Sequence, residues 1–183
     1  MKSTAFTGLE AELKKRLSRE RFAHSLRVAG LARAIARASG LDREKAYLAG
    51  LLHDLAKELP EAELIRLAPP VNEVERAHPL VLHGRAGRVL AESLGVKDPE
   101  VLAAIEGHVV GVDPGFGLGM AVYVADVAEP GRGYHQDLAE RALAGDLLGA
   151  YREAVRRKVA YLEERGIPVH PRTREVLARL AKD

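Results

Sequence analysis

Apolar side chains recur every three or four residues over most of this chain, which is the spacing of one helix face. The region 18–39 shows the pattern clearly: Phe22, Leu26 and Ala29 form one stripe, while Val28 and Ile35 belong to a second stripe beside it. We find no internal repeat, no low-complexity segment and no convincing β-hairpin signal. The pattern therefore predicts an all-α fold.

Residues that favour helix starts and stops divide the chain into its expected elements. Thr7 and Glu10 have the spacing of a capping box, Asp98-Pro99 combines an N-cap with proline at the first helical position, and Pro60 is a stop signal. We expect loops at 71–79 and 109–117. The expected helices cover about 7–17, 18–39, 42 to the region before Pro60, 61–68, 80–94, 99–108, 118–128, 136–143, 146–165 and 172–181.

The pair His53-Asp54 stands at the end of a nearly unbroken apolar run that begins at Ala46. The run reads as a buried helix that carries the pair toward Pro60. An imidazole and a carboxylate in such surroundings are costly unless something compensates their polarity. A metal ion would do so, because neutral imidazole and carboxylate are ordinary metal ligands.

More polar groups stand in similarly apolar settings along the chain. For any one of them, a hydrogen-bonded core residue is the more common explanation. Six such groups in one small domain change that balance, because few other partners are available to them. A shared metal centre would satisfy all six, which are His24, His53, Asp54, His83, His108 and Asp126.

Composition narrows the possible functions further. With 183 residues, the chain is expected to form a single domain over 1–183. The formal charge of only +2 does not indicate a nucleic-acid partner. The chain has no cysteine, which excludes disulfides and thiolate metal sites. No apolar run has the roughly 18–20 residues of a membrane span, and the N-terminus lacks a signal-peptide core, so we expect a cytoplasmic protein.

Several short motifs carry a resemblance to a known family. The order of the six polar residues resembles the metal signature of HD-domain phosphohydrolases, and more closely the chain resembles YqeK-type symmetrical bis(5'-nucleosyl)-tetraphosphatases. The motifs span roughly the central two-thirds of the chain. They are His24-Ser-Leu26, His53-Asp-Leu-Ala-Lys57, His83-Gly-Arg-Ala-Gly87, His108-Val-Val-Gly111 and Tyr123-Val-Ala-Asp-Val-Ala-Glu-Pro-Gly-Arg132.

The resemblance implies an HD-domain helical bundle with a dinuclear metal centre. By matching positions, His24, His53, Asp54 and Asp126 would hold one ion, while His83 and His108 would hold the other with Asp54 as the bridge. The family uses iron; the nitrogen and oxygen ligands also suit manganese or cobalt. The implied reaction is the splitting of diadenosine tetraphosphate into two ADP by a water that the two metals activate.

Cations near these motifs are candidates for holding substrate phosphates. Lys57 lies one turn beyond His53, and Arg132 follows a tight Pro-Gly turn, so both are expected to contact the phosphates and act in catalysis. Arg27 and Arg85 are further candidates for substrate binding. For Lys57 and Arg132, a solvated helix end and a surface turn remain the alternative explanations. The other three histidines, His78, His135 and His170, receive no role.

Two other functions stay open at this point. The same centre could act on another nucleotide or phosphoester, because function depends on the pocket rather than on the fold. The chain could also be a metal-stabilised binding module without activity, although an intact set of ligands with open positions argues against this. A nucleotide substrate is the partner we expect, without nucleic acid or membrane, and a homodimer is possible.

Overall fold

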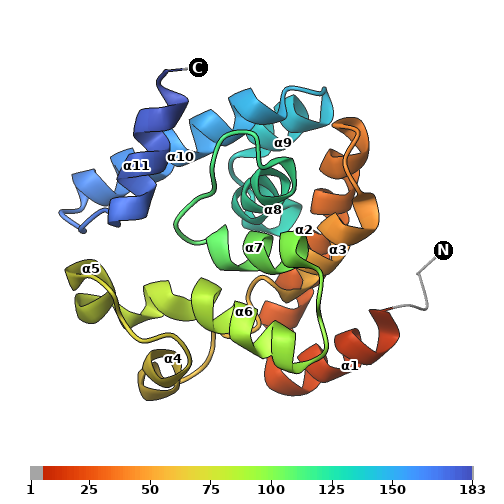
Figure 1. The fold of residues 1–183 in the computed structure, drawn as a ribbon. Coiled ribbons are helices and arrows are strands. Elements are labelled where there is room, and N and C mark those ends of the chain that lie inside the picture. Colours follow the sequence, from red (N-terminus) through yellow and green to blue (C-terminus); the bar gives the residue numbers. More distant parts are fainter. Residues whose placement is uncertain (1–5, 183) are drawn as a thin grey trace.

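The computed structural model describes residues 6–182, and all regular structure within that range is helical. Figure 1 shows the helices in a bundle. The α-helices are α1 (Thr7–Arg16), α2 (Arg19–Ala38), α3 (Arg43–Leu52), α4 (Glu61–Leu67), α5 (Glu73–Ala77), α6 (His83–Ser93), α7 (Pro99–Gly107), α8 (Gly117–Ala128), α9 (Gln136–Leu143), α10 (Leu147–Glu164) and α11 (Pro171–Leu180). Short 3-10 helices, η2 (Pro79–Leu82) and η3 (Pro130–Arg132), join some of them. The all-α prediction is confirmed.

Helix α8 forms the centre of the bundle. It packs against α2, α3, α7, α9 and α10, and in Figure 1 it is seen almost end-on with these helices around it. Its sequence is apolar all round, as expected of a helix that is buried on every side, and Leu118 through Ala125 are all buried. Asp126, near its end, is therefore carried on the most enclosed helix of the fold.

The helix pair with the most extensive contact, α2 with α3, depends on a small residue. A Cβ built on Gly50 would lie 2.9 Å from the Cα of Ala29, a distance that real Cβ atoms do not tolerate. Glycine at this position lets the two backbones approach, which places His24 on α2 beside the end of α3. Replacing Gly50 by a larger residue would separate the two helices at the site described below.

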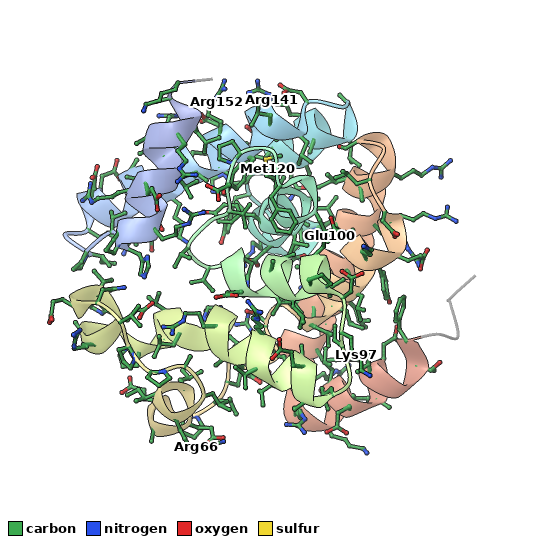
Figure 2. All side chains as sticks on the ribbon, viewed as in Figure 1. Arg66, Lys97, Glu100, Met120, Arg141 and Arg152 are labelled. Carbon is green, nitrogen blue, oxygen red and sulfur yellow. The ribbon has the colours of Figure 1, made fainter. Side chains whose placement is uncertain are left out.

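A smaller lobe is built from α4, α5, η2 and α6, which lie at the lower left in Figure 1. It has its own apolar cluster of five buried residues: Ala56, Leu64, Ala68, Leu82 and Ala86. The charged side chain of Arg66 extends from the lower edge of the bundle in Figure 2. Among the described helices, none combines the length and apolar character that crossing a bilayer requires.

Several element boundaries differ from the prediction. Helix α3 ends at Leu52, so His53-Asp54 lies in a run of turns, in which Leu55 N–H donates to Leu52 O at 3.0 Å and Lys57 N–H to Asp54 O at 3.0 Å. The expected loop at 71–79 contains α5, because the Asn72 side chain accepts a hydrogen bond from Glu75 N–H at 3.0 Å and caps a helix there.

Two helix starts were also wrong. The N-cap of α1 is Phe6, so Thr7 is already helical and does not occupy the capping position. The helix expected over 80–94 is 3-10 until Leu82, and α6 begins at His83. The predicted side-chain N-cap at Asp98 is present, and Ser18 and Asp42 cap α2 and α3 in the same way.

Candidate metal centre

Six polar side chains from distant parts of the chain meet in the interior. His24 comes from α2, His53-Asp54 follows the end of α3, and Asp126 comes from α8. The other two are His83 at the start of α6 and His108 directly after α7. The four histidines and Asp54 are buried. The structure therefore brings together all six residues that the sequence singled out.

Asp54 lies in the middle of the group, and its two carboxylate oxygens face opposite sides. Oδ2 is 3.4 Å from His53 Nε2 and 3.7 Å from His24 Nε2. Oδ1 is 3.3 Å from His83 Nε2 and 3.5 Å from His108 Nε2. We call His24, His53, Asp126 and Asp54 Oδ2 the first half, and His83, His108 and Asp54 Oδ1 the second half.

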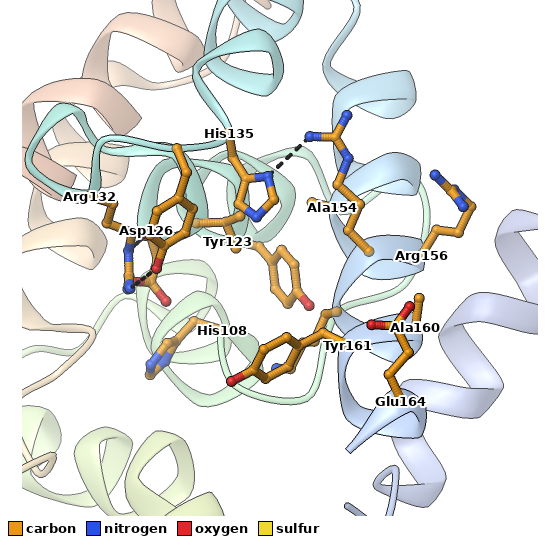
Figure 3. A pocket seen from close by; sticks show the side chains of 14 residues that line it. His108, Tyr123, Asp126, Arg132, His135, Ala154, Arg156, Ala160, Tyr161 and Glu164 are labelled. Carbon is orange, nitrogen blue, oxygen red and sulfur yellow. Dashed lines mark hydrogen bonds and ion pairs between the residues drawn. The ribbon is translucent and has the colours of Figure 1, made fainter. Parts of the chain in front are cut away.

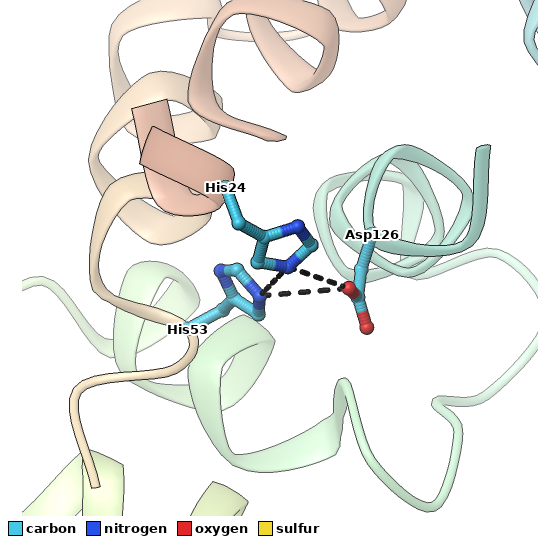
Figure 4. A group of neighbouring side chains, drawn as sticks. All are labelled: His24, His53 and Asp126. Atoms are coloured by element: carbon cyan, nitrogen blue, oxygen red, sulfur yellow. Dashed lines mark hydrogen bonds and ion pairs between the residues drawn. The ribbon is translucent and has the colours of Figure 1, made fainter. Parts of the chain in front are cut away.

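Donor atoms within the first half converge closely, as Figure 4 shows. His24 Nε2 is 3.3 Å from His53 Nε2, and Asp126 Oδ1 is 3.1 Å from His24 Nε2 and 3.6 Å from His53 Nε2. Two sets of donor atoms lie within 4.8 Å of one another, as the atoms around one metal ion would. These sets are His24, His53 and Asp126, and His53, Asp54 and His108.

Backbone carbonyls orient three of the imidazole rings. The Nδ1 atom lies 2.7 Å from Gly50 O in His53, 2.6 Å from Leu80 O in His83 and 2.7 Å from Ile105 O in His108. A carbonyl only accepts hydrogen bonds, so Nδ1 carries the proton. In a neutral ring, Nε2 then carries a lone pair that points into the centre. Metal-binding histidines usually have this arrangement.

The second half tests whether a cation fits. His83 Nε2 and His108 Nε2 are 3.1 Å apart. When both rings are neutral, two lone pairs face each other across this distance with no proton to share. Two ligands at about 2.1 Å from one ion, at angles between tetrahedral and octahedral, would be about 3.0–3.4 Å apart. The spacing and the nitrogen and oxygen donors therefore fit a divalent first-row metal.

Burial and neighbouring charge separate the two halves electrostatically. Burial disfavours the charged form of His53, but the carboxylates of Asp54 and Asp126 outweigh it and raise the pKa of His53 to about 10. In the second half, burial lowers the pKa of His83 to about 4, with His108 adding to the effect. Although burial opposes ionisation, the surrounding histidines hold the pKa of Asp54 and Asp126 well below the usual range.

Glu129 orients the His24 ring, a role that sequence reasoning missed. The side chain is buried, and Oε1 lies 3.0 Å from His24 Nδ1. It also accepts hydrogen bonds from Arg27 Nε at 2.6 Å and from Gly131 N–H at 2.6 Å. A carboxylate behind a metal-binding histidine fixes the ring and increases its basicity. The only signal was its place inside the Glu129-Pro-Gly-Arg132 motif.

Arg21 was missed as well. Its Nη1 donates to Asp54 Oδ2 at 2.8 Å. The residue lies three positions before His24 on α2, so both side chains share one helix face, and this spacing is the signal that could have identified it. Arg132, which was predicted, donates from Nη2 to Asp126 Oδ1 at 2.7 Å. Each carboxylate of the centre thus has an arginine partner.

The remaining predicted cations lie in different surroundings. The Lys57 side chain is half-buried, and its ammonium has no hydrogen-bond or ion-pair partner among residues 6–182. Burial lowers its pKa although Asp54 and Asp126 oppose the shift. Arg27 is held by Glu129. Arg85 pairs with Glu75 at 3.0 Å and lines a cavity that contains none of the six central residues.

Two cavities adjoin the centre. The larger, of about 590 Å³, is lined by His108, Asp126 and Arg132, among others, and is shown in Figure 3. The smaller, of about 300 Å³, is lined by His83 and Lys57, among others. Lys158 of α10 borders both of them. Nothing in the sequence pointed to this lysine, because it stands far from every motif in the chain.

Comparisons with known proteins identify the family of this chain. The HD domain family model matches residues 21–131. A relative from Bacillus subtilis, named bis(5'-nucleosyl)-tetraphosphatase, symmetrical, is 32% identical over 88% of this chain and 89% of its own length. A relative from Mycoplasma genitalium, named "Probable nicotinate-nucleotide adenylyltransferase/Ap4A hydrolase", is 39% identical over 68% of this chain, and the match spans only 36% of that longer protein.

A solved structure agrees over nearly the whole chain. It comes from Clostridium acetobutylicum, is described as a "predicted HD superfamily hydrolase involved in NAD metabolism", and matches with a TM-score of 0.90 at 32% identity over 97% of both chains. The family match covers more than half of the chain, and the Bacillus relative is covered almost completely. The chain therefore belongs to the HD-domain family and, within it, to the family of the symmetrical bis(5'-nucleosyl)-tetraphosphatases.

Proposed function

We propose that the protein is a metal-dependent hydrolase that cuts diadenosine tetraphosphate symmetrically into two ADP molecules. The observation that carries this proposal is the position of Asp54, whose two oxygens each face a separate pair of histidines. Such a carboxylate can bridge two ions, which is the arrangement used to hold both partners of an in-line phosphoryl displacement. The relative from Bacillus subtilis carries the name of this activity.

The donor set defines where the metals would be held. The first half would hold one divalent ion and the second half another, with iron as the family's metal and manganese or cobalt as alternatives. When bound, the ions supply Lewis-acid stabilisation of phosphate charge and lower the pKa of water. The site is enclosed by buried helices, which strengthens these electrostatic effects.

Side chains of the protein would position the substrate around this centre. The two cavities that adjoin the centre suit the two nucleoside halves, which supports a cut in the middle of the phosphate chain. Lys57 borders the smaller cavity and Arg132 the larger one, so each could neutralise charge on one side of the broken bond. The leaving group is ADP, which departs as a phosphate anion. Neutralising its charge helps it to leave more than protonating it would.

Product analysis tests the proposal directly. The protein is loaded anaerobically with ferrous, manganous or cobaltous ion and incubated with diadenosine tetraphosphate in ¹⁸O-labelled water. We expect ADP as the only nucleotide product, with one labelled oxygen for every two ADP molecules. AMP together with ATP, or a clear preference for a deoxynucleoside monophosphate in a substrate panel, would contradict the proposal. The Asp54→Ala variant serves as the inactive control.

A further inference from the structure

Lys158 is an unusual cation in this molecule because of where its ammonium lies. The Nζ atom is 5.5 Å from the centre of the Tyr123 ring and donates a hydrogen bond to the carbonyl of Val109. Within residues 6–182 no carboxylate lies within ion-pair distance of it. Its neighbours on α10 differ: Arg156 pairs with Glu153 at 2.7 Å, and Arg157 pairs with Asp137 at 2.6 Å. Lys158 therefore carries a positive charge without a carboxylate to balance it.

Tyr123 presents a second unsatisfied group to the same cavity. The residue is only 1% exposed, and its hydroxyl is a buried polar atom without a hydrogen-bond partner. Its ring packs edge-on against Tyr151, with ring centres 5.1 Å apart, which fixes the direction of the hydroxyl. In Figure 3 this hydroxyl points into the cavity between α8 and α10. A buried hydroxyl without a partner is costly, so a ligand that accepts a hydrogen bond from it would remove that cost.

We propose that the Tyr123 hydroxyl and the Lys158 ammonium form an anion subsite that holds a phosphate of the nucleotide beside the metal centre. Both groups are hydrogen-bond donors in the larger cavity, whose wall also contains His108 and Asp126. An ammonium repels a metal ion, so the subsite selects the oxygens of a phosphate and not a further cation. Lys158 borders both cavities, so it is available to an outer phosphate of a nucleotide held in either of them.

The inference rests on the proposed function for the identity of the ligand. It assigns Tyr123 and Lys158 a role in binding the substrate. A phosphate that is not part of the broken bond keeps nearly the same charge before and during the reaction, so its contacts stabilise the bound substrate and the transition state about equally. Loss of such a contact raises KM and leaves kcat nearly unchanged. A purely structural lysine would instead change the melting temperature or the metal content.

The test measures binding of ADP to the metal-loaded protein by calorimetry. The variants are Lys158→Met, which removes the charge and keeps most of the length of the side chain, and Tyr123→Phe, which removes only the hydroxyl. We expect Kd for ADP to rise about tenfold in Lys158→Met and about threefold in Tyr123→Phe, the range of one hydrogen bond to a charged or a neutral group. KM for the dinucleotide should rise similarly with kcat within about twofold, and Lys158→Arg should retain most of the affinity.

Controls separate this inference from the proposed function. Lys97→Met removes an equal charge from an exposed site, and its affinity for ADP should equal that of the wild type. The substrate bis(p-nitrophenyl) phosphate has no second phosphate, so its rate of hydrolysis should not depend on the subsite. Unchanged ADP affinity in Lys158→Met and Tyr123→Phe, in a protein that still forms ADP from the dinucleotide, would overturn the subsite alone. Lysine-dependent ADP binding without any cleavage of the dinucleotide would support the subsite and overturn the proposed function alone.

Discussion

The two halves of the candidate metal centre have the same histidine count but very different surroundings. In the first half, His24 and His53 face the carboxylate of Asp126, and Glu129 stands behind His24. In the second half, His83 and His108 share only Asp54 Oδ1, and their rings are oriented by backbone carbonyls. The first half therefore gathers negative charge, while the second half consists mainly of neutral donors.

This difference predicts unequal roles for the two halves. A divalent ion gains more from carboxylates than from neutral imidazoles, so the first half should bind its ion more tightly. The second half has three protein donors, which leaves more positions open for substrate oxygens. The charge-rich half would then anchor one ion, and the poorer half would exchange its ion and adapt to the phosphate.

The largest effect is expected for Asp54→Ala, because this residue alone belongs to both halves. Its loss should lower turnover by more than about 100-fold, beyond the range typical of supporting residues, and by more than any single histidine variant. The measurement is kcat for ADP formation at saturating metal, with circular dichroism to show that the variant is folded. Turnover close to wild type would show that Asp54 does not bridge.

Metal removal should reveal how much the centre stabilises the fold. Without metal, the carboxylates of Asp54 and Asp126 repel each other and the Nε2 lone pairs of His83 and His108 face each other. At metal concentrations about 100-fold above Kd, binding adds about 2.7 kcal/mol, which corresponds to a rise of about 5–10 °C in Tm. Calorimetric melting with metal and with chelator measures this shift; coincident curves would contradict a bound metal.

Glu129→Gln tests whether the support behind His24 gives the first half its advantage. The amide keeps the shape of the side chain but removes the charge that stabilises His24, so metal affinity of the first half should fall by about 10- to 100-fold. The second half should keep its affinity. Competition with a chelating dye resolves the two dissociation constants. Glu106→Gln, which removes a half-buried carboxylate paired with Arg88, is a matched control. An equal loss of metal affinity in both halves would argue against a special role of Glu129 in the first half.

Proton release should also differ between the halves, with a smaller effect. In the metal-free protein the pKa of His53 is raised to about 10, so at pH 7 an ion entering the first half must displace a proton. Its affinity should rise about tenfold per pH unit between pH 7 and 9. The pKa of His83 is lowered to about 4, so this ring is already neutral and contributes no such rise.

Calorimetry in buffers of different ionisation enthalpy counts these protons. We expect about one proton for the first equivalent of metal and fewer for the second. Equal release in both steps would remove the electrostatic contrast between the halves.

Sequence reasoning identified the six central residues, because polar groups on apolar faces and the family motifs both pointed to them. It misplaced His53-Asp54 within a helix, since the apolar run continues past Leu52 while hydrogen bonding changes to tight turns. It missed α5 because one side chain, Asn72, starts that helix. Lys158 could not be found from the sequence, since only the packing of α10 against α8 brings it near the centre.

Anomalous diffraction from crystals with one and then two equivalents of manganous ion tests the central claim most directly. We predict a first peak between His24, His53, Asp54 and Asp126. A second peak between Asp54, His83 and His108 should appear only with further metal, about 3.5–4 Å from the first. A first peak in the second half would contradict the unequal roles. A single peak that never becomes two would contradict the dinuclear centre itself.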